Sequence, residues 1–207
     1  NTTISFADIK PGVQLINNTA AGSNPTPIIL NTGESYAIAV QGPTNGNRDG
    51  LIGASITSDK PIAVNCGSFA GSNGTSSNLD LGMDQIVSAE RTGMEYIFIK
   101  GSGLDVTERP LLIADLDNTD IFLNGSTTPF ITLNSGEYLA LSGSDFSANG
   151  NLYVKSSKNI FAYQGIGGSD SQANQNMHFV PPLSCQTPKS INNIPLINEV
   201  GSLTDFT

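Results

Sequence analysis

The stretch DNTDIFLNGSTTPFITLNSGEYLAL, from Asp117 to Leu141, decides the fold of this chain. Two runs rich in β-branched and aromatic residues, Thr119–Leu123 and Pro129–Leu133, are separated by Asn124-Gly125-Ser126. Because Asn and Gly reach positive φ easily, apolar runs on either side of such a turn are typical of a β-hairpin. A second turn of the same kind, Asn134-Ser135-Gly136, follows directly. The stretch therefore predicts three antiparallel strands joined by two tight turns.

A degraded copy of this stretch opens the chain. Asn1-Thr2-Thr3-Ile4 corresponds to Asn118-Thr119-Asp120-Ile121, and Asn31-Thr32-Gly33-Glu34 corresponds to Asn134-Ser135-Gly136-Glu137. Three further matches keep the same order: Thr26-Pro27-Ile28 with Thr128-Pro129-Phe130, Lys60-Pro61-Ile62 with Lys158-Asn159-Ile160, and Met83 with Met177. Proteins with Asn/Gly turns resemble one another by composition, but five matches in one order favour a duplication.

The repeat is too long for a solenoid, whose units are roughly 20–50 residues. It predicts an all-β fold of two tandem, duplicated antiparallel β-sandwich-like domains, or one pseudo-symmetric double sandwich, with very little helix. The expected boundaries are residues 1–90, residues 91–185, and a linker or the start of a next domain over residues 186–207.

The first copy begins inside the repeat, so we expect the counterpart of residues 91–117 to precede Asn1. Its sheet should then show an unpaired edge or be completed from elsewhere. In the second copy Glu95–Lys100, EYIFIK, reads as a fully apolar buried strand, and Arg109–Ala114 is expected to pair with it. Met83 is expected in the core.

Composition indicates a secreted β protein. Charged residues make up 13% of the 207 residues, against roughly 25% in typical proteins, so the polar surface consists mainly of Asn, Ser, Thr and Gly. A net charge of −9 with 9 Lys and Arg disfavours binding to nucleic acid and to anionic membranes. No apolar run approaches the length of a membrane span, so we expect no membrane insertion and a secreted or cell-surface location.

The chain has two cysteines, Cys66 and Cys185, and they do not fall at equivalent places in the two copies. In a secreted chain an even count favours a disulfide, which here would link the two halves. Two buried free thiols are the other reading, because spacing alone does not bring the Cα atoms within reach.

The sequence favours a non-catalytic protein. His178 is its only histidine and sits in a strand pattern, where a structural role is the better interpretation. No metalloprotease, P-loop or nucleophile-elbow motif occurs. Asp115, Asp117 and Asp120 are weak candidates for Ca²⁺, the one cofactor the sequence permits, but the same residues suit a β-turn better.

Two loops rich in Ser, Gly and Asn, Gly67–Asn78 and Gly165–Asn176, take equivalent places in the two copies. Loops at the end of a sandwich commonly carry binding sites. The candidate ligand-binding residues are Ser68, Phe69, Asn73, Tyr163, Ser169, Asp170 and Asn174. The expected function is adhesion or ligand binding to an extracellular protein or glycan; the alternative is a structural spacer in the stalk of a surface filament.

Several motifs carry a family resemblance. They are SDKPIAVN from Ser58, DQIV from Asp84, EYIFIK from Glu95, DNT from Asp117 with Asn124-Gly125, and FVPPLSC from Phe179. With these motifs the chain resembles the IgGFc-binding-protein N-terminal family, which in bacteria is found in large secreted adhesin-like surface proteins. The resemblance implies an extracellular β module that contacts neighbouring domains of the same long chain, with no catalytic residues to transfer.

Overall fold

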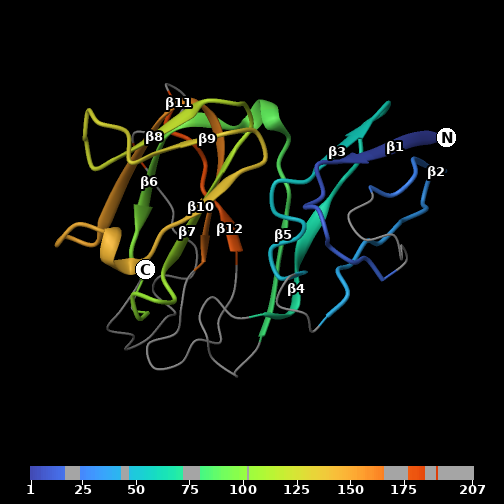
Figure 1. Ribbon diagram of the computed structural model, residues 1–207, viewed down its shortest axis with the longest axis horizontal. Helices are drawn as coiled ribbons and strands as arrows, with labels where there is room; N and C mark the ends of the chain where they lie inside the picture. The colour runs from blue at the N-terminus through green and yellow to red at the C-terminus, as the bar shows by residue number, and fades with distance from the viewer. Residues whose placement is uncertain are drawn as a thin grey trace.

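The computed structural model describes residues 1–16, 24–42, 47–71, 80–101, 103–165, 177–184 and 190. In these residues the protein is all-β: its strands pair antiparallel in three sheets (Figure 1). Helical structure is limited to short 3₁₀ turns such as η2 (Ala89–Arg91) and η3 (Gly143–Asp145). No helix in the described ranges has the length and apolar character needed to cross a bilayer.

The C-terminal part of the chain forms a seven-stranded sheet around one core. Its strands are β6 (Gly93–Ile99), β7 (Arg109–Ala114), β8 (Thr119–Leu123), β9 (Ile131–Leu133), β10 (Tyr138–Ala140), β11 (Asn151–Gly165) and β12 (Met177–Phe179). β8, β9 and β10 lie within the stretch that the turn pattern assigned to three strands, so the three strands are confirmed. β8 pairs with β9, but β10 pairs with β7 rather than with β9.

The 15-residue strand β11 organises this sheet. Its first half pairs with β6 and β8, its second half pairs with β7 and β12, and the register shifts between Lys155 and Ile160. The expected pairing of β6 with β7 is wrong, because both strands pair with β11 instead. One buried cluster joins the strands: Tyr96, Phe98, Leu112, Ala114, Ile121, Leu133, Leu141, Phe146, Leu152, Val154, Ile160 and Ala162.

The N-terminal part of the chain forms two smaller sheets. One has the order β2-β1-β3, with β1 (Thr2–Ala7), β2 (Ile28–Leu30) and β3 (Ser55–Ser58), and the other pairs β4 (Asn65–Gly71) with β5 (Asp80–Gln85). A small core of Ile9, Val13 and Leu15 packs beside Ile38 and Val40. Met83 on β5, which the sequence placed in the core, is 45% exposed.

The two parts use the same strand registers. Thr2 faces Leu30 and Ile4 faces Ile28 in β1–β2, as Thr119 faces Leu133 and Ile121 faces Ile131 in β8–β9. Ile4 also faces Ser58 of β3, as Ile121 faces Ser156 of β11. Cys66 faces Asp84 in β4–β5, as Gln164 faces His178 in β11–β12. The sequence repeat matched Ile28 with Phe130, whereas the strand registers match it with Ile131, one residue further on. The other pairs agree with the repeat.

The turns repeat as well. The backbone N–H of Asn31 donates to Glu34 Oε2 at 2.8 Å, and that of Asn134 donates to Glu137 Oε2 at 2.7 Å. Gly33 and Gly136 both have positive φ, 85° and 77°, which explains the glycine in each Asn-x-Gly-Glu turn.

The two parts touch through specific contacts. Tyr138 Oη donates to Asp49 Oδ2 at 2.8 Å, and Lys10 Nζ reaches the same oxygen at 2.7 Å. Beside them, a Cβ at Gly53 would lie 1.9 Å from the carbonyl oxygen of Gly136, so the two backbones meet where no side chain fits. The hydrogen bonds from Lys10 and Tyr138 hold the pKa of Asp49 below its usual value.

The packing predicts that neighbouring residues of β6 differ sharply in their effect on stability. Phe98 is fully buried and Ile97 is 45% exposed. Phe98→Ala should lower the free energy of unfolding by about 3–5 kcal/mol because it leaves a cavity. Ile97→Ala, on the same strand, should lower it by about 1 kcal/mol or less. Urea unfolding of both variants measures this; equal losses would contradict the assigned faces of β6.

The Asp49 contact predicts an acid dependence. A carboxyl whose folded pKa is depressed stabilises the protein above its unfolded pKa, ordinarily 3.8, and that contribution disappears as the pH falls through the folded pKa. The wild type should therefore be more stable than Asp49→Asn near neutral pH, and the difference should shrink below pH 3.8. Urea midpoints measured across that range check this; a constant difference would show that ionised Asp49 contributes nothing.

Candidate functional site

The strand pairs that carry the two predicted binding loops lie side by side. The backbone N–H of Phe179 on β12 donates to Asp84 Oδ2 on β5 at 2.9 Å. In Figure 1 the ends of β4–β5 and β11–β12 from which the loops leave lie on the lower side of the molecule. The structure therefore brings together the bases of two loops that are about a hundred residues apart in sequence.

The predicted loop residues themselves fall largely outside the described residues. Ser68 is exposed on β4, and Phe69 follows it on the same strand, with its side chain outside the description. The remaining loop candidates are outside it entirely: Asn73, Ser169, Asp170 and Asn174. Ligand binding by these residues stays a prediction.

Tyr163, expected at the rim of a loop, is instead 2% exposed. Its ring packs edge-on against Phe179, with centroids 5.8 Å apart, and its hydroxyl has no hydrogen-bond partner. Burial, followed by the nearby Asp84 and Cys66, raises the pKa of Tyr163 to about 12. This phenol therefore stays neutral and supports the junction of the two strand pairs rather than presenting a ring to a ligand.

Cys66 lies partly buried on β4, and burial raises the pKa of its thiol. A raised pKa keeps the thiol protonated and weakly reactive. Cys185 lies outside the described residues, so a Cys66–Cys185 disulfide stays a prediction.

The weak calcium candidates accept hydrogen bonds that stabilise the turns and strands around β8 and β9. Asp117 Oδ1 accepts from the backbone N–H of Ser135 at 3.0 Å, and Asp120 Oδ1 accepts from Thr132 Oγ1 at 2.6 Å. The third, Asp115, contributes its backbone oxygen to the Ser135 hydroxyl. Within the described ranges, no three His, Cys, Asp or Glu side chains gather closely enough to hold a metal ion.

His178 is exposed on β12 and lines an open hollow of about 560 Å³ together with Asp84, Ser88 and Arg91. A catalytic triad would need the carboxylate to orient the imidazole. Both oxygens of Asp84 instead accept backbone N–H groups, those of Gln85 at 2.7 Å and of Phe179 at 2.9 Å. The geometry of this hollow gives no support to nucleophilic catalysis.

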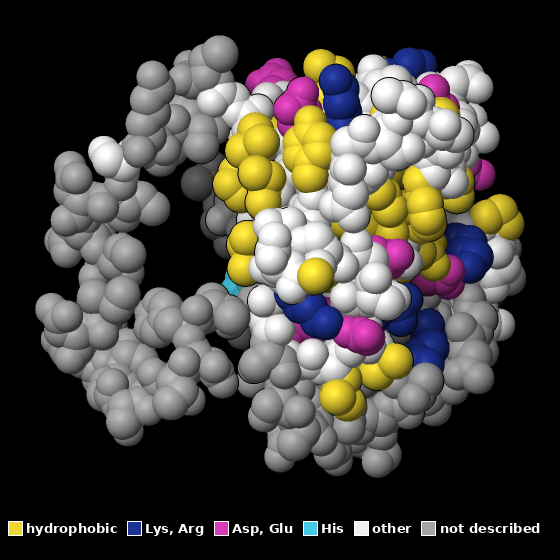
Figure 2. Space-filling model, turned by 90° about the vertical axis from the view of Figure 1, so that its left-hand side faces the viewer, with side chains coloured by type: hydrophobic (Ala, Val, Ile, Leu, Met, Phe, Trp, Pro, Cys, Tyr) yellow, Lys and Arg dark blue, Asp and Glu magenta, His cyan; other side chains and the backbone are white. Residues whose placement is uncertain are grey.

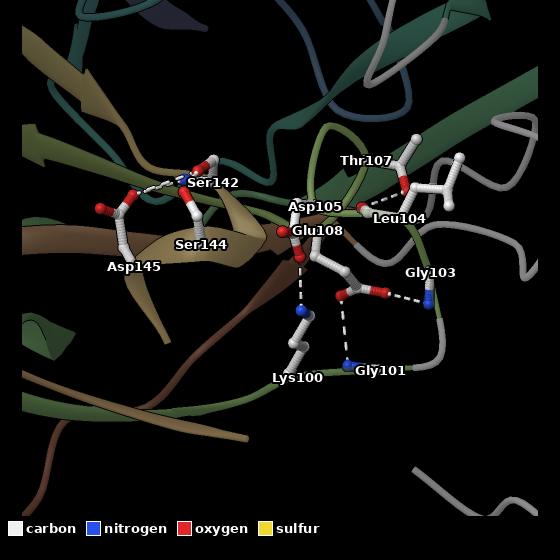
Figure 3. Close-up of polar contacts among 10 residues, drawn as sticks. All are labelled: Lys100, Gly101, Gly103, Leu104, Asp105, Thr107, Glu108, Ser142, Ser144 and Asp145. Atoms are coloured by element: carbon white, nitrogen blue, oxygen red, sulfur yellow. Dashed lines mark hydrogen bonds and ion pairs between the residues drawn. The ribbon is translucent and has the colours of Figure 1, made fainter. Parts of the chain in front are cut away.

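The connection between β6 and β7 is held by a buried carboxylate, Glu108 (Figure 3). Its two oxygens accept the backbone N–H groups of Gly101 at 3.2 Å and Gly103 at 2.9 Å. Lys100 and Asp105 form an ion pair at 2.5 Å on the outside of the same connection. Glu108 therefore fixes the path of a polar loop that the sequence left unassigned.

A second connection joins this one. Ser142 and Asp145 form a capping box around η3, visible beside the first connection in Figure 3. The backbone N–H of Gly143 donates to the Asp105 carbonyl at 2.8 Å. Gln164 Nε2 donates to the Ile99 carbonyl at 2.5 Å, which ties the end of β11 to the end of β6. These contacts place both connections at the end of β11 from which its loop leaves.

A row of apolar side chains lies on the outer face of the C-terminal sheet. Ile97 and Ile99 on β6 are 45% and 56% exposed. Tyr153 faces Ile97 across the β6–β11 pair, and Phe122 and Glu95 both face Lys155, so all of these side chains share one face. We call Ile97, Ile99, Phe122 and Tyr153 the apolar stripe. Figure 2 shows hydrophobic side chains gathered on the side where β6, β8 and β11 lie in Figure 1.

Charged residues border this stripe. Glu95 and Lys155 face each other directly across β6 and β11. Partial burial and a hydrogen bond to Glu95 raise the pKa of Tyr153. An exposed apolar row with a polar border has the composition of a contact surface for another protein.

The sequence interpretation missed this surface. It treated EYIFIK as buried on both faces, whereas the structure buries Tyr96 and Phe98 and exposes Ile97 and Ile99. The exposure of Ile97 and Ile99 could have been predicted, because a strand of an antiparallel sheet commonly buries one face and exposes the other. An apolar outer face in such a strand indicates a contact surface.

A family model described as IgGFc binding protein matches residues 1–200. Neither the curated proteins nor the solved structures gave a match.

The two carboxylates of the β6–β7 connection predict unequal effects. Glu108→Ala should lower the free energy of unfolding by about 1–3 kcal/mol, because it leaves the partly buried N–H groups of Gly101 and Gly103 without their acceptors. Asp105→Ala, which removes only a surface ion pair, should cost about 1 kcal/mol or less. Denaturant unfolding of both variants measures the difference. Similar small losses for both would show that Glu108 does not hold the connection.

Proposed function

Because the chain belongs to the IgGFc-binding family, we propose that it is a non-catalytic module of an extracellular protein that binds a protein partner. Family membership supports an extracellular binding role. The chemistry of the described residues agrees with this proposal, since the hollow beside His178 lacks an oriented acid–base pair. The low share of charged residues and the Asn/Gly turns also suit a secreted β module.

The observation that carries the proposal is the apolar stripe. A soluble sheet normally turns polar side chains outward, because exposed apolar area is unfavourable in water. Here Ile97 and Ile99 project from a strand whose opposite face buries Tyr96 and Phe98 completely. The stripe is thus rigidly presented, so a partner that covers it loses little conformational freedom in the sheet. A protein surface with an apolar centre fits this chemistry.

We extend the proposal to adhesion by assigning a second part of the binding surface to the loops that leave β4–β5 and β11–β12. Their bases are fixed side by side by the Asp84–Phe179 contact. Short polar side chains, as in Ser68, Asn73 and Asn174, suit hydrogen bonds to a glycan or to a protein rim. In this extended form, the stripe supplies apolar contact area and the loops supply selectivity.

A spacer in a surface filament is the second proposal, and the contact between the two parts favours it. Tyr138–Asp49, Gly53–Gly136 and Asp84–Phe179 form a close, specific junction. Such a junction transmits force without a flexible linker. Under this alternative the stripe would be covered by a neighbouring domain of the same chain rather than by a separate ligand.

We also propose that the two parts are duplicated units, over residues 1–90 and 91–185. The shared registers in three strand pairings and the shared Asn-x-Gly-Glu turns support this. Unrelated β proteins share turn types, but they do not share residue-for-residue registers in the order of a sequence repeat.

A binding comparison tests the function. The 207-residue chain would be measured against immobilised IgG Fc, extracellular-matrix proteins and a glycan array. We expect saturable binding to a protein, weakened about tenfold or more by the double variant Ile97→Thr/Ile99→Thr, since central apolar contacts dominate such interfaces. The matched control is Ile16→Thr/Ile29→Thr, which changes two isoleucines that are 61% and 62% exposed elsewhere.

The other outcomes are equally decisive. Binding that survives the stripe variant but is lost when residues 72–79 and 166–176 are replaced would move the site to the loops. An absence of binding to every probe at millimolar concentration would favour the spacer.

A further inference from the structure

Apolar residues of the N-terminal part are exposed where their counterparts in the C-terminal part are fully buried. Ile56 on β3 is 42% exposed and Ile62 is 39% exposed. Under the shared registers, Ile56 corresponds to Val154, and the sequence repeat matches Ile62 with Ile160. Both counterparts are 0% exposed. Both positions therefore hold apolar residues of the kind found in a core, but no described part of the chain covers them.

The structure of the C-terminal part shows what covers the counterparts. Tyr96 and Phe98 of β6 and Leu112 and Ala114 of β7 belong to the same buried cluster as Val154 and Ile160. β6 and β7 are also the strands that pair with β11 along its length. Both the apolar cover and the strand pairing therefore come from one two-stranded segment.

The N-terminal part lacks this pairing among the strands that the structure describes. β3 pairs only with β1 and ends its sheet, and β4 pairs only with β5. The corresponding halves of β11 pair with two strands each. The free edges of β3 and β4 and the exposed Ile56 and Ile62 thus form one surface, which has the composition of an incomplete sandwich.

We propose that this surface is a strand-acceptor site for a two-stranded apolar segment of the same kind as β6–β7, supplied by the same polypeptide. Main-chain hydrogen bonds along β3 and β4 would hold the segment, and its inward side chains would cover Ile56 and Ile62. The same-chain source follows from the C-terminal part, where only residues 115–118 separate β7 from β8. The inference rests on the proposed duplication but not on the proposed ligand.

A fusion tests the site with residues of this chain. Residues 91–117 would be repeated directly ahead of Asn1, because Asn1 matches Asn118, the residue that follows this segment in the C-terminal part. Hydrogen exchange in β3 and around Cys66 on β4 should slow by about tenfold or more, because new pairing protects the amides. The melting temperature should rise by several degrees.

The matched control carries the same added segment with Tyr96→Ser, Phe98→Ser and Leu112→Ser in the added copy only. It should behave like the original chain, because the strands lose their apolar cover. Should the fusion fail to fold, a synthetic peptide of residues 91–117, added to the 207-residue chain, replaces it and should slow the same amides.

Equal exchange and equal melting temperatures for the fusion, its control and the original chain would overturn the proposal. Protection that appears only in a concentration-dependent dimer of the original chain would also overturn it, because the strands would then come from a second copy. Loss of ligand binding has no bearing on this result, so the two proposals fail separately.

Discussion

The structure depends on one long strand, β11, that pairs with four others. β11 contributes Leu152, Val154, Ile160 and Ala162 to the core, all of them fully buried. It pairs with β6 and β8 before its register shift and with β7 and β12 after it. Because a sheet that shares one long central strand folds as a unit, the loops at the end of β11 and the outer face of β6 are held in fixed relation. Both surfaces considered for binding owe their position to this strand.

The N-terminal part uses the same pairings with less burial. Ile4 is 5% exposed at the place where Ile121 is 0% exposed, and Ile56 is 42% exposed where Val154 is 0% exposed. Since hydrophobic stabilisation scales with the apolar area removed from water, the two parts should contribute unequally to the stability of the chain. The small cluster of Ile9, Val13 and Leu15 compensates only partly. This imbalance, rather than any single contact, distinguishes the two parts.

Local chemistry made the turns and the repeat readable from the sequence. The second turn needs a glycine at positive φ, which is Gly136, and a carboxylate that accepts the backbone N–H of Asn134, which is Glu137. Both residues can be recognised in the sequence. Long-range features could not be read this way. The burial of Tyr163 depends on Phe179, and the partner of β7 depends on where β11 lies. The outer face of β6 was misread because EYIFIK is apolar on both faces, a pattern that a buried strand shares.

Native-state hydrogen exchange of the unmodified chain, resolved by residue, tests this account most directly. The account predicts the slowest amides in the centre of β11, around Val154 and Ile160–Gln164, with β6 and β7 close behind. Amides of β3 and β4 should exchange much faster, because among the described strands each of these two has a partner on one side only. Equal protection in β3, β4 and β11 would contradict the claim that one complete and one incomplete unit share the same strand pairings.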